Sequence, residues 1–199
     1  ILGDLFETWV GDDDDAELAT SITAALAELT AAGPGLFIMR GNRDFLLDRQ
    51  FCAATGATLL PDPYRMNLLG RGALLMHGDL LCIDDTDYQA FREQVQQQDW
   101  REVTLAQPLQ DRRDLAAELR KLSHEAKSNK AEDILDVNPA EVDRVMQASN
   151  VQLLIHGHTH RRGHHQVPPG DRWLLGDWDS GPNALKVTSE DIESIDISF

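Results

Sequence analysis

Three histidines follow a short apolar run near the carboxyl end of the chain. Residues 151–155 (VQLLI) have the composition of a buried strand, and His156, His158 and His160 come directly after it. Alternate residues of an extended chain project to one side, so we expect His158 and His160 to aim at a common point. Neutral imidazole is the commonest protein ligand for transition metals, which predicts a metal site. The alternative is a polar turn whose histidines face water.

Other apolar runs also end in a glycine beside a residue that can bind a metal. Asp4, Asn42 and His77 stand in such positions, after residues 1–2, 36–39 and 73–76. Open α/β sheets build their sites from loops of this kind at strand ends. A carboxylate, an amide oxygen and imidazoles suit Mn, Fe or Zn better than Ca or a structural zinc. Two such ions about 4 Å apart would activate a water and stabilise charge on a phosphoryl group.

The elements between these loops must hold them in place. Apolar residues at helical spacing predict a helix over 18–29, with the acidic run Asp12–Asp15 capping its N-terminus. A short helix is predicted over 46–55. Residues 64–69 and 73–76 flank Gly70-Arg71-Gly72, which predicts a hairpin with a three-residue loop. Strands are also predicted over 173–175, 184–187 and 195–199.

Residues 85–149 have a helical character that interrupts the strand series. Tyr88, Phe91 and Val95 share one helical face, and Leu115, Leu119 and Leu122 share another. Asn138-Pro139-Ala140-Glu141 predicts a helix start with a capping box. The segment is interpreted as an inserted helical lid, and the alternative is ordinary helical packing.

Composition limits the possible classes of function. The 199 residues are 42% hydrophobic, which predicts one domain with a substantial core. Lys and Arg number 18 against 34 Asp and Glu, and the net charge of −16 repels nucleic acids and anionic membranes, so any such contact must be local. Cys52 and Cys82 form no disulfide framework, as in a reducing compartment. No membrane-spanning stretch or signal peptide is visible, and we expect the N-terminus to be cut.

The order of the motifs resembles that of the calcineurin-like metallophosphoesterases. Their pattern is D-x-H, G-D, G-N-[HR]-[DE], H and G-H-x-H, which this chain matches in residues 3–4, 41–44, 77 and 157–160, without D-x-H. The resemblance implies an α/β sandwich of two mixed β-sheets flanked by helices, whose first strand is missing here. It also implies a single domain over 1–199 with a helical lid insertion at about 85–149.

Within this superfamily the chain is similar to the family of UDP-2,3-diacylglucosamine diphosphatases. The similar segments are LGDLFE (2–7), GNRDFL (41–46), HGD (77–79) and IHGHTHR (155–161), with Trp9, Gly11-Asp12-Asp13, Leu81-Cys82, Asp84-Asp85, Tyr88-Gln89 and Phe91-Arg92. This resemblance implies manganese-dependent hydrolysis of UDP-2,3-diacylglucosamine to UMP and 2,3-diacylglucosamine 1-phosphate in lipid A synthesis. It further implies a peripheral position on the cytoplasmic face of the inner membrane. We expect no nucleic acid and no obligate protein partner.

The same resemblance assigns roles to individual residues. Asp4 would bridge two Mn²⁺ ions, and the remaining metal ligands would be Asn42, His77, His158 and His160. Without D-x-H, one ion would be held tightly by Asp4, Asn42, His77 and His158, and the other only by Asp4 and His160. Asn42 and Arg43 would be catalytic. The implied substrate contacts are Asn42, Arg43, Asp85, Ser123, Lys127, Lys130 and His158, with Lys127 standing where the family usually has Asn.

Each residue also has a purely structural interpretation. Asp79 and Asp85 could cap turns or helices, the helical face with Ser123, Lys127 and Lys130 could simply be solvated, and Arg43 could pair with Asp44 or Asp48. Trp9 and Trp100 are expected in the core rather than against lipid, and His156 is expected to hold its turn. His124, His164 and His165 are expected to be exposed and without partners.

Two other functions remain open from the sequence. One is a calcineurin-like phosphodiesterase that acts on a soluble nucleotide, and the other is a catalytically silent scaffold of the same fold. Arg43 bears on the choice, because a guanidinium cannot act as a general acid. An enzyme with arginine at this position should favour a leaving group that needs no proton, such as a sugar 1-phosphate.

Overall fold

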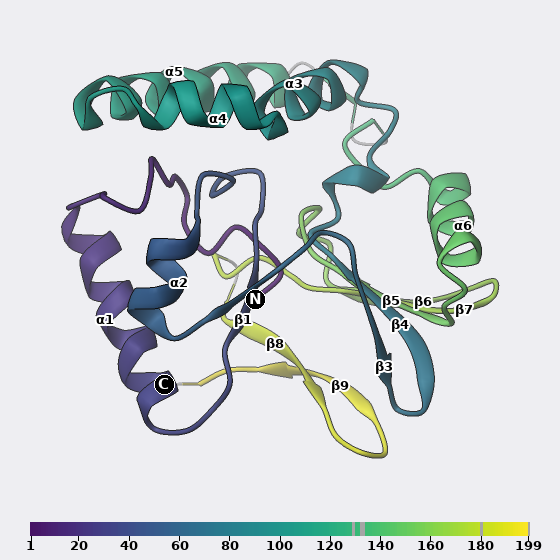
Figure 1. Ribbon diagram of the computed structural model, residues 1–199. Coiled ribbons are helices and arrows are strands. Elements are labelled where there is room, and N and C mark those ends of the chain that lie inside the picture. Colours follow the sequence, from purple (N-terminus) through teal and green to yellow (C-terminus); the bar gives the residue numbers. More distant parts are fainter. Residues whose placement is uncertain (129, 132–133, 180, 199) are drawn as a thin grey trace. The chain divides into compact units, whose positions relative to one another are not determined.

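The computed structural model describes residues 1–128, 130–131, 134–179 and 181–198 (Figure 1). The chain forms two compact units. Unit one comprises Ile1, Gly3–Pro61 and Asp85–Leu135, and unit two comprises Leu2, Asp62–Asp84 and Asp136–Phe199. The predicted helical insertion at 85–149 therefore contributes to both units. Its role as a lid, and the description of the chain as a single domain, stay predictions.

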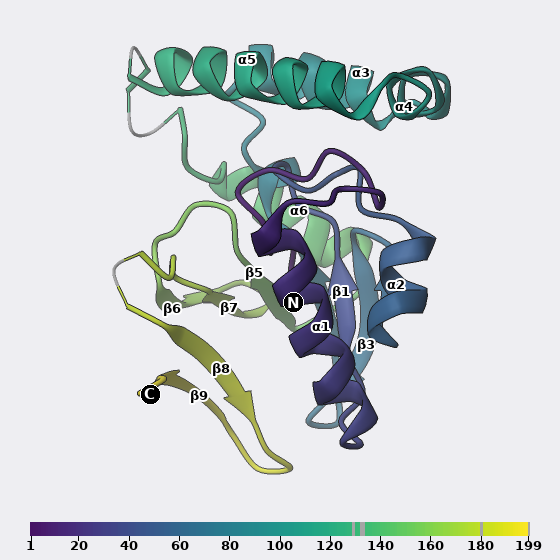
Figure 2. The same ribbon diagram turned by 90° about the vertical axis from the view of Figure 1, so that its left-hand side faces the viewer.

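Unit one contains a short parallel strand pair and most of the helices. Its elements are α1 (Glu17–Ala31), β1 (Phe37–Met39), α2 (Arg49–Thr55), β2 (Thr58–Leu60), α3 (Thr86–Gln96), α4 (Gln98–Leu105) and α5 (Leu109–Ser128). Strands β1 and β2 pair in parallel with Ile38 opposite Leu59. Helices α1 and α2 lie side by side, and α5 runs alongside α3 and α4 (Figures 1 and 2). The helices over 18–29 and 46–55 are confirmed, the second beginning three residues later than predicted.

The core of unit one is aromatic. Phe6 stacks on Trp9 with ring centroids 4.5 Å apart, and Phe51 of α2 meets both rings edge-on at 5.9 and 5.2 Å. Trp9 is 4% exposed, and Trp100 of α4 packs against Phe45, so both tryptophans lie in the core as predicted. Such clusters bury a large apolar area and fix the loop that runs from Asp4 to Asp15.

The acidic run before α1 does not cap that helix, which corrects the prediction. The N-cap of α1 is Ala16, which has no side-chain cap hydrogen bond. Asp12 instead accepts hydrogen bonds from Asp48 N and Phe51 N, at 3.0 and 2.9 Å, and so satisfies the start of α2. The other carboxylates of the run pair with arginines of α5. Local spacing cannot reveal such partners, because they lie far away in the sequence.

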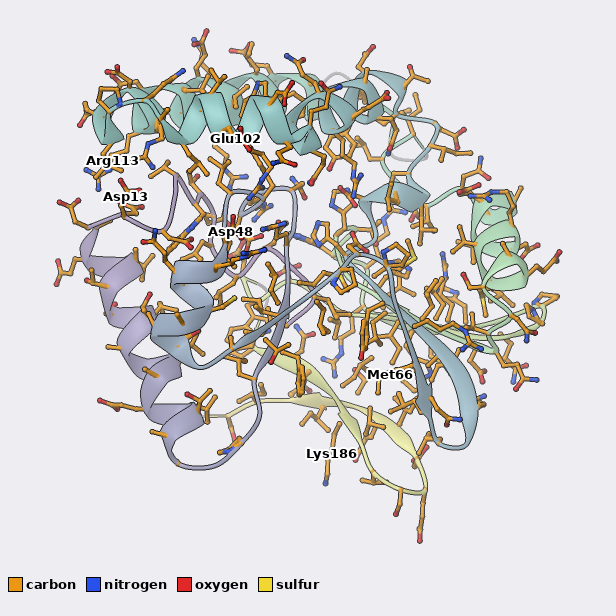
Figure 3. All side chains as sticks on the ribbon, in the orientation of Figure 1. Asp13, Asp48, Met66, Glu102, Arg113 and Lys186 are labelled. Atoms are coloured by element: carbon orange, nitrogen blue, oxygen red, sulfur yellow. The ribbon has the colours of Figure 1, made fainter. Side chains whose placement is uncertain are left out.

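Arg112 anchors helix α5 to this acidic loop. Its guanidinium donates to Val10 O at 2.6 Å and to both carboxylate oxygens of Asp13 at 2.7 and 2.5 Å. Arg113 pairs with Asp14 and Asp15, and Figure 3 shows its side chain close to Asp13. These arginines account for the position of the helix on its loop.

Unit two is built on a mixed five-stranded sheet. Its elements are β3 (Tyr64–Leu68), β4 (Arg71–Met76), the 3-10 helix η1 (Asp79–Leu81), α6 (Pro139–Ala148), β5 (Leu153–His156), β6 (Gly163–Val167), β7 (Gly170–Leu174), β8 (Asn183–Val187) and β9 (Ile192–Asp196). The strand order is β3-β4-β5-β7-β6, with β8 and β9 forming a separate hairpin. Strand β5 is parallel to both of its neighbours, β4 and β7. The α/β class with a mixed sheet is as predicted, whereas the β1–β2 pair is purely parallel.

The two faces of this sheet bury different sets of side chains. Leu74, Met76 and Leu154 pack with Val142 and Met146 of α6. The alternate residues Ala73, Leu153 and Ile155 pack with Ile192 of β9 on the other side. All four residues of β5 are buried, as expected for a strand covered on both faces. Figure 1 shows α6 beside this sheet. The sheet thereby fixes the loops that follow β4 and β5.

Several element boundaries differ from the predictions. The β3–β4 hairpin has a two-residue loop, Leu69-Gly70, and both residues have positive φ (54° and 75°), as a tight hairpin turn with the right twist requires. Strand β9 ends at Asp196 rather than running over 195–199, and β2 and β6 were not predicted. The N-cap Asn138 is confirmed, since its side chain accepts from Ala140 N and Glu141 N. The capping box is wrong: the amide of Asn138 bonds Leu81 O, and Glu141 pairs with Arg144.

Within the described part of the chain, no helix is both long and apolar enough to cross a membrane. Cys52 and Cys82 are not joined to each other in a disulfide.

Candidate functional site

In unit one, the loop of Asp4 is tied to the loop that carries Asn42 and Arg43. The carboxylate of Asp44 is fully buried and accepts hydrogen bonds from Asp4 N (3.2 Å), Leu5 N (2.7 Å) and Gly41 N (2.6 Å). Asp4 Oδ1 in turn accepts from Arg43 N at 2.9 Å. Sequence reasoning missed the role of Asp44, although its place as the last residue of the G-N-R-D motif was the available signal.

Asp4 packs directly against Gly41. A Cβ atom added at Gly41 would come within 2.1 Å of Asp4 Oδ1 and 2.4 Å of Asp4 N, so only glycine fits. Asp4 itself has a positive φ of 54°, a left-handed conformation that is uncommon for residues other than glycine. Backbone strain of this kind is frequent where a side chain must be aimed at a ligand.

The guanidinium of Arg43 is held by two carboxylates. Its Nε lies 3.5 Å from Asp4 Oδ2, and its Nη1 pairs with Glu7 Oε1. The side chain of Arg43 is 16% exposed. The alternative pairing with Asp44 or Asp48 is wrong, because Asp44 binds backbone amides and Asp48 binds Arg40 at 3.0 Å. Arg43 and Asn42 therefore lie beside Asp4 in one loop cluster.

In unit two, His77 and His158 come together after β4 and β5. Their ring centroids are 5.0 Å apart, and Gly157 N donates to His77 O at 2.8 Å. Nδ1 of His77 bonds to Leu2 O at 2.8 Å. Since a carbonyl only accepts, the proton sits on Nδ1 and the lone pair sits on Nε2. A second bond that fixes the tautomer in this way is typical of histidines that bind metals.

His158 and His160 do not lie in extended chain, which corrects the reasoning from alternation. Strand β5 ends at His156, and His158 and His160 both have positive φ, at 67° and 59°. His160 is exposed and lines a pocket of about 420 Å³ with Arg162, Asp177, Asn183 and Asp196. Neither His77 nor His158 is among the described residues that line this pocket. The structure thus brings His77 and His158 together, and His160 lines the pocket.

His156 has the structural role that the sequence predicted. Its ring is fully buried, with Nδ1 3.0 Å from Gly157 O, and a Cβ at Gly78 would approach Nδ1 to 2.9 Å. Burial lowers the pKa of His156 to about 4. The ring is therefore neutral at physiological pH and packs the turn between β5 and His158.

Four of the predicted substrate contacts, Asp85, Ser123, Lys127 and Lys130, belong to the helical segment of unit one. Asp85 caps α3 by accepting from Tyr88 N and pairs with Lys130 Nζ at 2.5 Å. Ser123 is exposed on α5, and the side chain of Lys127 lies outside the described residues. The structure brings Asp85 and Lys130 together. The interpretation of Asp85 as a helix cap is confirmed, and its contact with the substrate stays a prediction.

Of the other histidines, His124 and His165 are exposed as predicted. His164 is not without partners: its ring stacks on Trp173 at 4.1 Å and its Nε2 lies 3.0 Å from Asp171 Oδ1.

Each unit carries candidate metal donors. Unit one offers the carboxylate of Asp4 and the amide oxygen of Asn42, and unit two offers the imidazole nitrogens of His77, His158 and His160. Oxygen and nitrogen donors of these types are ligands that Mn, Fe and Zn accept. Because His77 Nδ1 donates its proton to Leu2 O, Nε2 of His77 carries the lone pair that can bind a metal.

Most of the chain matches a known protein family. The model of the calcineurin-like phosphoesterases matches residues 1–162 of the chain. The chain belongs to the calcineurin-like phosphoesterases. This family uses divalent metals, in agreement with the donor set described above.

Individual relatives of this phosphoesterase carry a more specific name. A protein named UDP-2,3-diacylglucosamine hydrolase from Cellvibrio japonicus is 52% identical over 182 residues, which cover 89% of this chain and 76% of the relative. A protein of the same name from Marinobacter nauticus is 47% identical over 183 residues, 90% of this chain and 75% of the relative. One from Enterobacter sp. strain 638 is 46% identical over 203 residues, 100% of this chain and 85% of the relative.

Proposed function

We propose that this phosphoesterase hydrolyses the pyrophosphate bond of UDP-2,3-diacylglucosamine, releasing UMP and 2,3-diacylglucosamine 1-phosphate for lipid A synthesis. The observation that carries the proposal is the 52% identity over 89% of the chain to a relative named UDP-2,3-diacylglucosamine hydrolase. The cluster of Asp4, Asn42 and Arg43 supports it, because a phosphoryl group needs both metal ligands and a cationic donor.

The metal in this proposal is Mn²⁺, two ions in the complete site. Asp4, Asn42, His77, His158 and His160 would hold it, with Asp4 as the bridging ligand. When bound, such a centre supplies Lewis-acid polarisation of a phosphoryl oxygen and a water activated as the nucleophile. Asp44 accepts hydrogen bonds from the amides of Asp4 and Gly41 and so holds their two loops together. Leu2 O accepts from His77 Nδ1 and so keeps the proton of His77 on that nitrogen.

Arg43 binds the phosphoryl oxygens as their charge develops. A guanidinium keeps its proton, so the leaving group must depart without general-acid help. A sugar 1-phosphate has a second ionisation near pKa ~6, by analogy with phosphorylated side chains, and leaves as an anion. The planar fork of Arg43 makes two parallel hydrogen bonds, which a lysine cannot reproduce.

The helical segment would bind the remainder of the substrate. In the proposal Asp85, Ser123, Lys127 and Lys130 contact it, and His158 and Asn42 contribute both to metal and to substrate binding. Lys130 lies 2.5 Å from Asp85, so its charge is partly compensated before substrate arrives. The protein would work at the cytoplasmic face of the inner membrane as a peripheral protein, because its lipid substrate resides there.

The test is a direct assay of the purified protein with Mn²⁺. We expect UMP release from UDP-2,3-diacylglucosamine, no release by Asp4→Asn, and a large loss of rate in Arg43→Lys. His124→Ala, which changes an exposed histidine of α5, is the matched control and should keep its rate. Turnover of soluble nucleotide diesters without turnover of the lipid would support the alternative phosphodiesterase instead. Mn²⁺ binding without any turnover would support a silent scaffold.

A further inference from the structure

Glu7 lies between two arginines that belong to different elements. Its Oε1 pairs with Nη1 of Arg43, and its Oε2 pairs with Nη2 of Arg120 on α5. Each carboxylate oxygen therefore serves a different guanidinium. The Glu7 side chain is 64% exposed, whereas that of Arg43 is 16% exposed. An exposed ion pair contributes little to the free energy of folding. The main effect of these two ion pairs is therefore to fix the positions of the side chains.

The two carboxylates beside Arg43 contact different atoms of its guanidinium. Asp4 Oδ2 lies 3.5 Å from Nε, near the stem, and Glu7 reaches Nη1 at the far end. A long arginine side chain has many rotamers, and contacts at both ends of the planar group fix its orientation. Asp4 is also a ligand of the proposed metal, whereas Glu7 is not, so Glu7 can hold Arg43 without competition from the metal. Glu7 in turn is held from the other side by Arg120.

We propose that Glu7 is a positioning residue that aims the Arg43 guanidinium and connects it to helix α5 through Arg120. The proposal rests on the proposed function, in which Arg43 binds the phosphoryl group during hydrolysis. Donors that are aimed before the reaction cost no reorganisation when charge develops. Loss of the Glu7 carboxylate would leave Arg43 present but free to rotate. It would therefore slow the chemical step more than it weakens substrate binding.

The first test observes Arg43 directly and does not depend on activity. Side-chain ¹⁵N NMR of the purified protein reports how fast the Arg43 guanidinium rotates about its Cζ–Nη bonds. We expect slow rotation in the wild type and faster rotation in both Glu7→Gln and Arg120→Gln. Glu118→Gln is the matched control, because Glu118 is an exposed glutamate on α5, the helix that carries Arg120. Unchanged rotation in Glu7→Gln would overturn the positioning role, and unchanged rotation in Arg120→Gln would overturn the connection to α5.

The second test measures hydrolysis of the nucleotide–lipid pyrophosphate. We expect Glu7→Gln to lower kcat between about 10- and 100-fold with KM changed much less, since misplacing a catalytic group by 1 Å has an effect of that order. In an Arg43→Met background, Glu7→Gln should cost no further rate, because both changes remove one function. An equal loss in both backgrounds would overturn the proposal. If the wild type itself fails to hydrolyse the lipid, the proposed function fails, and the NMR test still decides the role of Glu7.

Discussion

At the scale of single residues, the loop around Asp4 leaves little freedom for substitution. Gly41→Ala would place a methyl group 2.1 Å from Asp4 Oδ1 and force the carboxylate away. We expect Mn²⁺ affinity to fall by about tenfold or more, as when partners that orient a ligand are changed. Isothermal titration with Mn²⁺ measures this. Gly35→Ala is the control, since its Cβ would meet only the ring of Phe37, at 3.3 Å. Equal affinities of the two variants would contradict the expectation.

Asp44 offers a second prediction at this scale. Its buried carboxylate accepts from three backbone amides, and Asn would turn an NH₂ group towards at least one of these donors. We expect Asp44→Asn to lower the free energy of unfolding by about 2–4 kcal/mol, because hydrogen bonds to a charged acceptor contribute about 1.5–3 kcal/mol each. Urea denaturation measures the loss. The exposed Asp99→Asn should change stability by no more than about 0.5 kcal/mol. A loss that small for Asp44→Asn would show that the amides find other partners.

At the scale of elements, Arg112 decides how α5 sits on the acidic loop. It is 4% exposed and occupies the space above Gly11, where a Cβ would lie 2.3 Å from Nη1. Arg112→Met should cost about 1–2 kcal/mol, a modest value because Asp13 is 59% exposed and can be rehydrated. Hydrogen exchange should rise in residues 9–15 and in α5. Arg49→Met, an exposed arginine at the start of α2, is the control. Unchanged exchange in the Arg112 variant would contradict the anchoring role.

The five-stranded sheet of unit two should have a pH-sensitive edge. Asp171 of β7 bonds Arg71 of β4 at 2.7 Å and His164 of β6 at 3.0 Å. These hydrogen bonds, the one from Arg71 more than the one with His164, hold the pKa of Asp171 below its ordinary value of 3.8. A depressed folded pKa gives stability that is present above the unfolded pKa and is lost as pH falls through the folded value.

Wild-type stability should therefore fall as pH drops below about 3.8, and Asp171→Asn should remove part of that fall while lowering stability at neutral pH. Urea midpoints between about pH 2 and pH 7 measure both effects. Asp191→Asn, in the turn between β8 and β9, serves as a control outside this cluster. Identical pH profiles for Asp171→Asn and wild type would contradict the assignment.

At the scale of the whole molecule, bound metal should raise stability. A ligand that binds only the folded state at 100 times its dissociation constant adds about 2.7 kcal/mol. We expect saturating Mn²⁺ to raise the thermal midpoint, EDTA to reverse the rise, and Asp4→Asn to reduce it strongly. Differential scanning fluorimetry measures the shift. Mg²⁺ at the same concentration controls for general screening of the net charge of −16. An equal rise with Mg²⁺ and in Asp4→Asn would contradict a specific site.

Much of the fold and the family can be derived from the sequence alone. Helical spacing predicted α1, and apolar runs predicted β1, β4 and β5, because the pattern of apolar residues records which side of an element is buried. The G-N-R-D and G-H-x-H motifs identified the family, since they follow strands in a fixed order. The cap Asn138 was equally readable, because a helix start is decided within four residues.

Only the tertiary structure decided what depends on partners distant in the chain. In the folded protein the acidic run accepts hydrogen bonds from the amides of Asp48 and Phe51 and pairs with the arginines of α5, instead of capping α1. The tertiary structure also turned His158 and His160 into left-handed conformations and gave Glu7 two arginines from different elements. Hydrogen bonds and ion pairs carry no periodicity, so nothing near a carboxylate in the sequence reveals which donor it will meet. Packing settles that choice, because it brings the donors together only once the apolar faces are buried.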